Sequence, residues 1–524
     1  MTNPSAASPR RWGLAICLLS LAMALWVLQR QLPLATLPAA IWQPDLSDLA
    51  QLKVHYSWLP RFCVALLCGA ALGLAGLLMQ QVLRNPLASP TTLGVASGAQ
   101  LSLALATLYA PGLLIAGEWV ALAGGGLATL LVFALARRRG LSPLSLILAG
   151  LVISLLLGAL NVMLMLLQPM GLSAMFIWSA GSLSQNNWDA VLFLLPRLGL
   201  ALVLITLLVR PLSLLELDDS GARSLGLSLD RLRVVALALA VFMTACVVSS
   251  VGVIGFIGLA APTIARLMGA RTLRQRLVWT PLLGAALLLL TDQLVQGFAG
   301  RLSELLPTGG VTALLGAPLL LWLIPRLRLS TGRPQPSTQR TVSQPLGGHR
   351  LLPLMLLGLL LLAVVALLLG QGPQGWNWSL NPELLQWRLP RLFAALGAGL
   401  LLGLAGCLLQ RLTGNPMASP ELMGISAGAA LGLMLTLFVW IGAPFWVRLI
   451  MGFAGALLVL LVIVGFARRQ AYAPERLLLV GIAISALFDA VKMLVLSLND
   501  PRGQSVLSWL SGSTYFVELP TGIM

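Results

Sequence analysis

Two stretches of this sequence are copies of each other and decide the kind of fold. Residues 59–103 read LPRFCVALLCGAALGLAGLLMQQVLRNPLASPTTLGVASGAQLSL, and residues 389–433 read LPRLFAALGAGLLLGLAGCLLQRLTGNPMASPELMGISAGAALGL. They align without a gap at an offset of 330 residues, and about half of the positions are identical. A second pair, residues 142–160 and 473–491, aligns at an offset of 331. The chain is therefore predicted to hold two homologous units in tandem, both in the same orientation.

The composition indicates a membrane protein. Hydrophobic residues make up 58% of the 524-residue chain and charged residues only 9%, whereas a soluble chain carries roughly 25% charged residues. Apolar runs long enough to span a bilayer recur along the sequence, and they do not alternate as the strands of a membrane barrel would. We therefore predict an all-α polytopic membrane protein.

Fifteen membrane segments are expected, ten before residue 326 and five after residue 350. The segment at 256–268 is short and carries Pro262, which is typical of a half-helix covered by protein. The predicted organisation is a first unit over 1–325, a linker over 326–350 and a second unit over 351–524. At the offset of the repeat, counterparts of residues 194 onward would lie beyond residue 524. The second unit is therefore expected to be incomplete, and the 524-residue form to be inactive or poorly stable alone.

The distribution of charge predicts the topology. The chain has a formal net charge of +17, and its arginines stand in short groups between the apolar runs. This is the pattern of cytoplasmic loops under the positive-inside rule, and we favour it over any contact with nucleic acid. The N-terminus and the linker are predicted to be cytoplasmic. The first apolar run could belong to a cleaved signal peptide, but we interpret it as a retained span because no clear small-residue cleavage site follows it.

Several kinds of site are missing from the sequence. Neither lysine, Lys53 or Lys492, stands in the glycine-rich context of a phosphate-binding loop. The two histidines, His55 and His349, are isolated, and the five cysteines form no CxxC pair. We expect no enzyme active site, no metal site and no bound cofactor. If ATP drives this protein, another polypeptide must supply the ATPase.

Five stretches together resemble the permease family of ABC importers for iron–siderophore complexes and vitamin B12. They are the two copies at 59–103 and 389–433, AxSLG at 222–226, GVIGFIGLAAP at 252–262 and LPTGGVTALLGAP at 306–318. The resemblance implies ten helices per unit, two units around one central path, and a multi-pass location in the bacterial inner membrane. It implies three partners as well: a cytoplasmic ABC ATPase dimer that binds ATP, a periplasmic siderophore-binding protein and an iron–siderophore substrate.

The polar segment 218–233 is a candidate coupling loop. Asp219, Ala222 and Gly226 resemble the family's E-x-x-A-x-x-x-G pattern, with Asp in place of Glu. The resemblance implies that this loop, together with Arg231, docks onto the ATPase. The alternative is an ordinary solvated loop between two spans.

Arginines on the sparsely basic side of the membrane are candidate docking residues. Arg61 and Arg391 belong to the two LPR motifs, and Arg388 lies three residues before Arg391. Arginine suits bidentate pairing with carboxylates, and the resemblance implies that these residues meet acidic groups of the binding protein. Arg301 is a weaker candidate. The alternative is interfacial anchoring beside tryptophans such as Trp58.

Polar residues inside predicted spans are candidates for the translocation path, because such residues are costly in a bilayer. Those named from their position are Gln80, Gln410, Asn161, Asp489 and Lys492. Those implied by the resemblance, in the short segment after the fifth span of each unit, are Trp178, Ser182, Trp509 and Ser513.

Glycines recur at matching points of the two copies. They are predicted to let helices approach closely and to be structural. In order along the chain they are Gly69, Gly73, Gly76, Gly399, Gly403 and Gly406.

The leading hypothesis is the membrane permease of a binding-protein-dependent ABC importer that passes a ferric hydroxamate or a similar iron chelate into the cytoplasm. The alternative from another class is an ion-coupled secondary transporter, in which Asp489 and Lys492 would carry the coupling. A nonfunctional truncated permease is a third possibility. The coupling loop distinguishes the first two, because a secondary transporter needs no ATPase.

Overall fold

The computed structural model describes most of the chain at residue level. The described residues are 9–85, 88–89, 93–137, 143–168, 171–172, 175, 178–214, 228–298, 307–323, 348–372, 375–379, 382–413, 419–420, 423–440, 442–469, 474–497, 512 and 514.

The first part of the chain is mainly helical in its described residues. The long helices are α1 (Pro9–Gln31), α4 (Leu59–Leu83), α5 (Val95–Tyr109), α6 (Gly117–Arg137), α7 (Pro143–Leu167), α9 (Asp189–Leu214), α11 (Leu229–Val251), α12 (Ile257–Leu267), α13 (Leu273–Phe298) and α14 (Thr308–Leu323). Short elements join them: η1 (Leu34–Thr36), α2 (Leu37–Trp42), α3 (Leu49–Lys53), η2 (Val54–Trp58) and η4 (Pro111–Ala116).

The second part repeats this arrangement with fewer described elements. It contains α15 (Gly348–Leu368), α16 (Pro382–Thr413), α17 (Ile425–Val439), α18 (Phe445–Arg469) and α19 (Pro474–Ser497). A small antiparallel hairpin of β1 (Leu369–Gly372) and β2 (Gly375–Trp378) joins α15 to α16, with Leu369 opposite Trp378.

The helices confirm the predicted membrane fold. Within the described ranges, ten helices are long and apolar enough to cross a bilayer, and shorter apolar helices stand at 95–109, 257–267, 308–319 and 425–439. With α19 they follow the order of the fifteen predicted segments. The predicted short segment is the eleven-residue helix α12, which contains Pro262. Helix α5 ends at Tyr109, and a 3₁₀ turn follows before α6.

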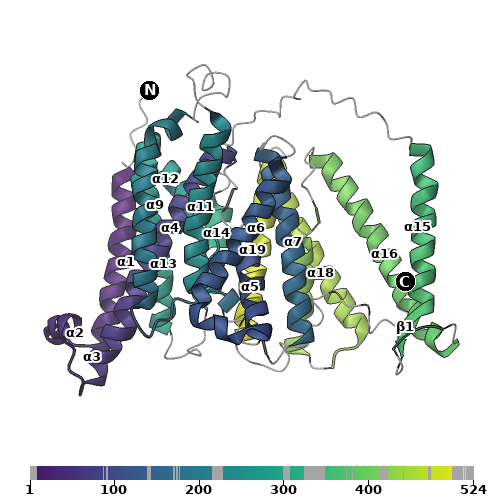
Figure 1. Cartoon of the computed structure of the whole chain (residues 1–524), viewed down its shortest axis with the longest axis horizontal. Coiled ribbons are helices and arrows are strands. Elements are labelled where there is room, and N and C mark those ends of the chain that lie inside the picture. Colours follow the sequence, from purple (N-terminus) through teal and green to yellow (C-terminus); the bar gives the residue numbers. More distant parts are fainter. Residues whose placement is uncertain are drawn as a thin grey trace.

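The long helices run side by side, so the molecule has two ends (Figure 1). We call the end where α4 begins and α13 ends the outer end, because the charge pattern predicts it to face the periplasm. Helices α2 and α3 lie at this end. Asp48 starts α3 by accepting the backbone N–H of Ala50 at 2.9 Å, which is the usual role of an N-cap side chain. A π-helical turn, η2, then leads directly into α4.

Helix α4 forms the centre of the first unit. It packs against α9, α11, α12 and α13. In its most apolar 18-residue stretch, 72% is buried inside the molecule. Its glycines allow these close contacts. A Cβ on Gly76 would overlap the backbone carbonyl oxygen of Gly258 in α12, and one on Gly69 would overlap that of Gly284 in α13. The predicted glycine seam is therefore a helix-packing surface in the first unit.

The matching helix of the second unit is exposed. Helix α16 lies beside α15, away from the centre of the molecule (Figure 1). Its most apolar 18-residue stretch has no buried part. A Cβ on Gly399, Gly403 or Gly406 would meet no atom of the described residues within 4 Å. The glycines of this seam thus contact neighbouring helices in the first unit, whereas open space lies beside the matching glycines of the second unit in the described ranges.

The two units meet through α14 and α19. A buried apolar cluster contains Ala317 of α14 with Val480, Ala483 and Ile484 of α19. Phe256, just before α12, packs against this cluster. The last described helix of each part therefore contributes to one shared core.

Candidate functional site

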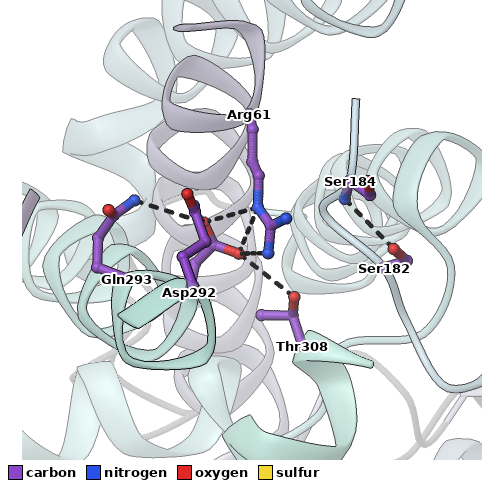
Figure 2. Close-up of polar contacts among 7 residues, drawn as sticks. Arg61, Ser182, Ser184, Asp292, Gln293 and Thr308 are labelled. Carbon is purple, nitrogen blue, oxygen red and sulfur yellow. Dashed lines mark hydrogen bonds and ion pairs between the residues drawn. The ribbon is translucent and has the colours of Figure 1, made fainter. Parts of the chain in front are cut away.

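A bidentate ion pair joins two helices near the outer end (Figure 2). Arg61, in the first turn of α4, donates from Nε to both carboxylate oxygens of Asp292 in α13, at 2.9 and 3.0 Å. Its Nη2 donates to Oδ1 of Asp292 at 2.7 Å. The Asp292 side chain is 0% exposed and that of Arg61 is 17% exposed. Removing one partner of such a pair costs about 3–5 kcal/mol, because the other charge stays buried without its counterion.

Three neutral side chains complete the surroundings of the Asp292 carboxylate. Gln296, one turn later on α13, donates to Oδ2 at 2.7 Å. Thr308, the first residue of α14, donates its hydroxyl to Oδ1 at 3.3 Å. The Nε2 atom of Gln293 lies 3.5 Å from Oδ2 of Asp292. The carboxylate therefore connects α4, α13 and the start of α14.

A backbone junction lies next to this pair. The N–H of Gly309, the residue after Thr308, donates to the carbonyl oxygen of Gly181 at 2.9 Å. The N–H of Ser182 donates to the carbonyl oxygen of Val251, at the end of α11, at 2.9 Å. Segment 178–182 is thus held between α11 and α14. Figure 2 shows Ser182 in the same close-up as the Arg61–Asp292 pair and Thr308.

Glycine is required in this junction. Gly252 has a φ of 76°, which disfavours any residue with a Cβ. A Cβ there would also overlap the carbonyl oxygen of Trp178. The motif GVIGF at 252–256 therefore starts with a residue that permits two loops to touch.

Of the predicted path residues, the structure brings Trp178 and Ser182 into this junction. Asn161 lies elsewhere, 3% exposed, and its Nδ2 donates to the carbonyl oxygens of Ser97 in α5 at 3.1 Å and of Leu157 at 3.0 Å. These bonds join α7 to α5, so Asn161 acts here as a helix contact.

The two equivalent glutamines have different surroundings. Gln80 is 4% exposed and accepts a hydrogen bond from Nη2 of Arg266 in α12 at 2.8 Å. Gln410, on α16, is exposed. Neither glutamine lies beside the junction at 178–182, because both stand near the opposite, inner ends of their helices.

Asp489 and Lys492 both lie on α19. The Asp489 side chain is exposed, and that of Lys492 is outside the described side chains. Their roles in the translocation path or in ion coupling stay predictions.

The predicted docking arginines occupy three different settings. Arg61 is paired with Asp292 inside the chain, as described above. Arg388 is half-buried and donates to the carbonyl oxygens of Leu367 and Ser379, at the base of the hairpin. Arg391 is half-buried in α16. Docking by any of them stays a prediction.

Several predicted site residues lie outside the described part of the chain. Arg231 is described and is exposed in the first turn of α11. The predicted residues outside the description are Asp219, Ala222, Gly226, Arg301, Trp509 and Ser513.

Sequence reasoning missed the pairing of Arg61 with Asp292. Asp292 lies near the end of an apolar span and was the available signal, because an ionisable residue in a span normally has a partner. The sequence does not indicate which arginine pairs with Asp292. Arg197 was missed as well: its guanidinium lies 3.8 Å from the ring centroid of Phe193 and 4.6 Å from that of Trp119. Among the described residues, no group of three or more His, Cys, Asp or Glu could hold a metal ion.

Comparisons with known proteins agree on one family. The profile of the FecCD transport family matches residues 16–326 and 352–521. The iron(3+)-hydroxamate import system permease protein FhuB of Salmonella typhimurium is 48% identical over 491 residues, which are 92% of this chain and 71% of that protein. FhuB of Escherichia coli is 47% identical over 92% of this chain and 74% of its own length.

A solved structure supports the same assignment. A metal-chelate type ABC transporter in an inward-facing conformation has a TM-score of 0.51 and 30% identity, covering 61% of this chain and 100% of its own. With the helices described above, these matches identify a multi-pass membrane protein. The chain belongs to the FecCD transport family.

Proposed function

We propose that this chain is the permease subunit of an ABC importer that carries an iron(3+)-hydroxamate chelate into the cytoplasm. The strongest support is the 48% identity to the Salmonella iron(3+)-hydroxamate permease over 92% of this chain. The similarity to a metal-chelate type ABC transporter adds to it. The chain itself would bind no cofactor, and ATP would be hydrolysed by a separate ATPase subunit.

The coupling loop would transmit the energy. Asp219, Ala222 and Gly226, followed by Arg231, would present a compact surface to the ATPase at the inner end of the molecule. This proposal rests on the resemblance of the motif and on the exposure of Arg231. Its test is given in the Discussion.

The translocation path would run past the segment Trp178–Ser182. This segment is held by backbone hydrogen bonds to α11 and α14. Trp509 and Ser513 would play the same part in the second unit. Gln80, Gln410, Asn161, Asp489 and Lys492 remain weaker candidates, because Gln80 and Asn161 bond neighbouring helices.

The outer end would receive a binding protein that carries the chelate. Arg388 and Arg391 would pair with its acidic residues, with Arg301 as a weaker candidate. We expect Arg388→Glu with Arg391→Glu to weaken binding of that protein strongly, while either single change has a small effect, since an exposed ion pair contributes about 0.2–1 kcal/mol. Binding would be measured at low and high salt. An affinity that ignores both charge reversal and salt would indicate interfacial anchoring instead.

A gene deletion tests the proposed substrate. Cells that lack this chain are expected to lose uptake of ferric hydroxamates and to keep uptake of ferric citrate and cobalamin. Restoring the gene should restore hydroxamate uptake. If the deletion strain takes up ferric hydroxamates normally but loses another chelate, the substrate class is wrong although the family is right.

A further inference from the structure

The Arg61–Asp292 pair connects the outer end of α4 to segment 178–182 through a short series of contacts. Thr308 donates to the Asp292 carboxylate at 3.3 Å, and the next residue, Gly309, donates its N–H to Gly181 at 2.9 Å. The ion pair and the bond to segment 178–182 are thus only one residue apart on α14. A shift of Asp292 must therefore act on the first turn of α14.

The contact between α14 and this segment leaves no free space. A Cβ on Gly309 would overlap the carbonyl oxygen of Ala180 and would lie 2.7 Å from that of Val253. Packed backbones of this kind do not deform gradually, so they transmit small displacements. The start of α14 and segment 178–182 must therefore move together or separate.

We propose that Arg61 and Asp292 are positioning residues that hold segment 178–182 in place. Arg61 is at the start of α4, the outer end where a binding protein would dock. A carboxylate of a docked partner could compete with Asp292 for Arg61, and the released Asp292 would then loosen α14 and segment 178–182. This role goes beyond simple docking by Arg61, and it rests on the proposed function for the docked partner and for its effect on transport.

The test measures the position of the chain at Ser184, two residues after the segment. Spin labels on Ser184→Cys and Tyr109→Cys, both exposed near the outer end, would report their separation in the whole chain, reconstituted in lipid with its other cysteines replaced. Asp292→Asn removes the charge and is expected to shift or broaden the distance distribution. The matched control is Asp45→Asn, an exposed acid at the same end, which should change nothing.

Two further variants keep the test decisive if Asp292→Asn does not insert. Thr308→Val removes only the hydroxyl contact and should give a smaller shift. The exchange Arg61→Asp with Asp292→Arg should restore the original distribution. The proposal would be overturned if Thr308→Val, and any Asp292 variant that inserts into the membrane, showed the same spin-label distances as the original chain. It would also be overturned if the exchange of Arg61 and Asp292 did not restore the original distance distribution.

The rate of chelate uptake provides a second, independent measurement. In an importer with its partners present, Asp292→Asn should lower the maximal uptake rate by about two- to thirtyfold, the range of mutational effects on coupling between sites. The concentration for half-maximal uptake should change less. Since the spin-label distances need no substrate, ATP or partner, a distance shift in a variant with normal uptake would leave the positioning role standing and would overturn only its proposed effect on transport.

Discussion

Gly76→Leu is expected to prevent the chain from folding into its native helix packing, so that little intact protein accumulates in the membrane. The added side chain would meet the backbone carbonyl of Gly258, and α12 cannot move away without breaking its contacts with α13. Overpacking a core typically costs about 1–3 kcal/mol, and we expect the upper end or more because the obstacle is backbone. The measurement is the amount of folded protein in detergent, by size exclusion and thermal unfolding.

The repeat provides a matched control for this variant. Gly406 is the counterpart of Gly76 on α16, and within the described part of the chain a Cβ there has no neighbour within 4 Å. Gly406→Leu should leave the yield and the unfolding temperature of the 524-residue chain unchanged. Equal damage from both substitutions would mean that α16 is packed in the folded protein, contrary to the described structure.

Gly226→Trp is expected to release the ATPase subunit from the chain while leaving membrane insertion intact. A bulky residue in a docking loop interferes with close contact, and each loss of about 1.4 kcal/mol weakens binding tenfold. We therefore expect ATPase co-purification to fall by about tenfold or more. The control is Gly112→Trp, a surface glycine near the outer end with open space around it. Normal co-purification and normal transport in Gly226→Trp would rule out 218–233 as the coupling loop.

Much of the fold follows from local patterns that the sequence states directly. Long apolar runs predict spans, and Pro262 in a short run predicts the half-length helix α12. The repeated glycines predict close helix packing, which the contacts of Gly69 and Gly76 confirm for α4. The open seam on α16 was not predictable in the same way, because identical motifs do not reveal which neighbours are present.

The site was less predictable, because it depends on pairing between distant residues. Arg61 and Asp292 are 231 positions apart, and either could have had another partner. The LPR motif suggests a contact of Arg61 with a partner, which stays a prediction, but the motif does not reveal its ion pair with Asp292 within the chain. The hydrogen bond from Gly309 to Gly181 is also invisible in the sequence, since it involves only backbone atoms.

The most direct measurement is the energy source of ferric hydroxamate uptake in cells where the importer that contains this chain is the sole route for that substrate. We predict that uptake stops when cellular ATP is exhausted while the membrane potential is maintained. It should continue when an ionophore dissipates the ion gradients and ATP remains available. Uptake that survives ATP exhaustion and fails with the ionophore would contradict an ATP-driven importer and would favour an ion-coupled transporter.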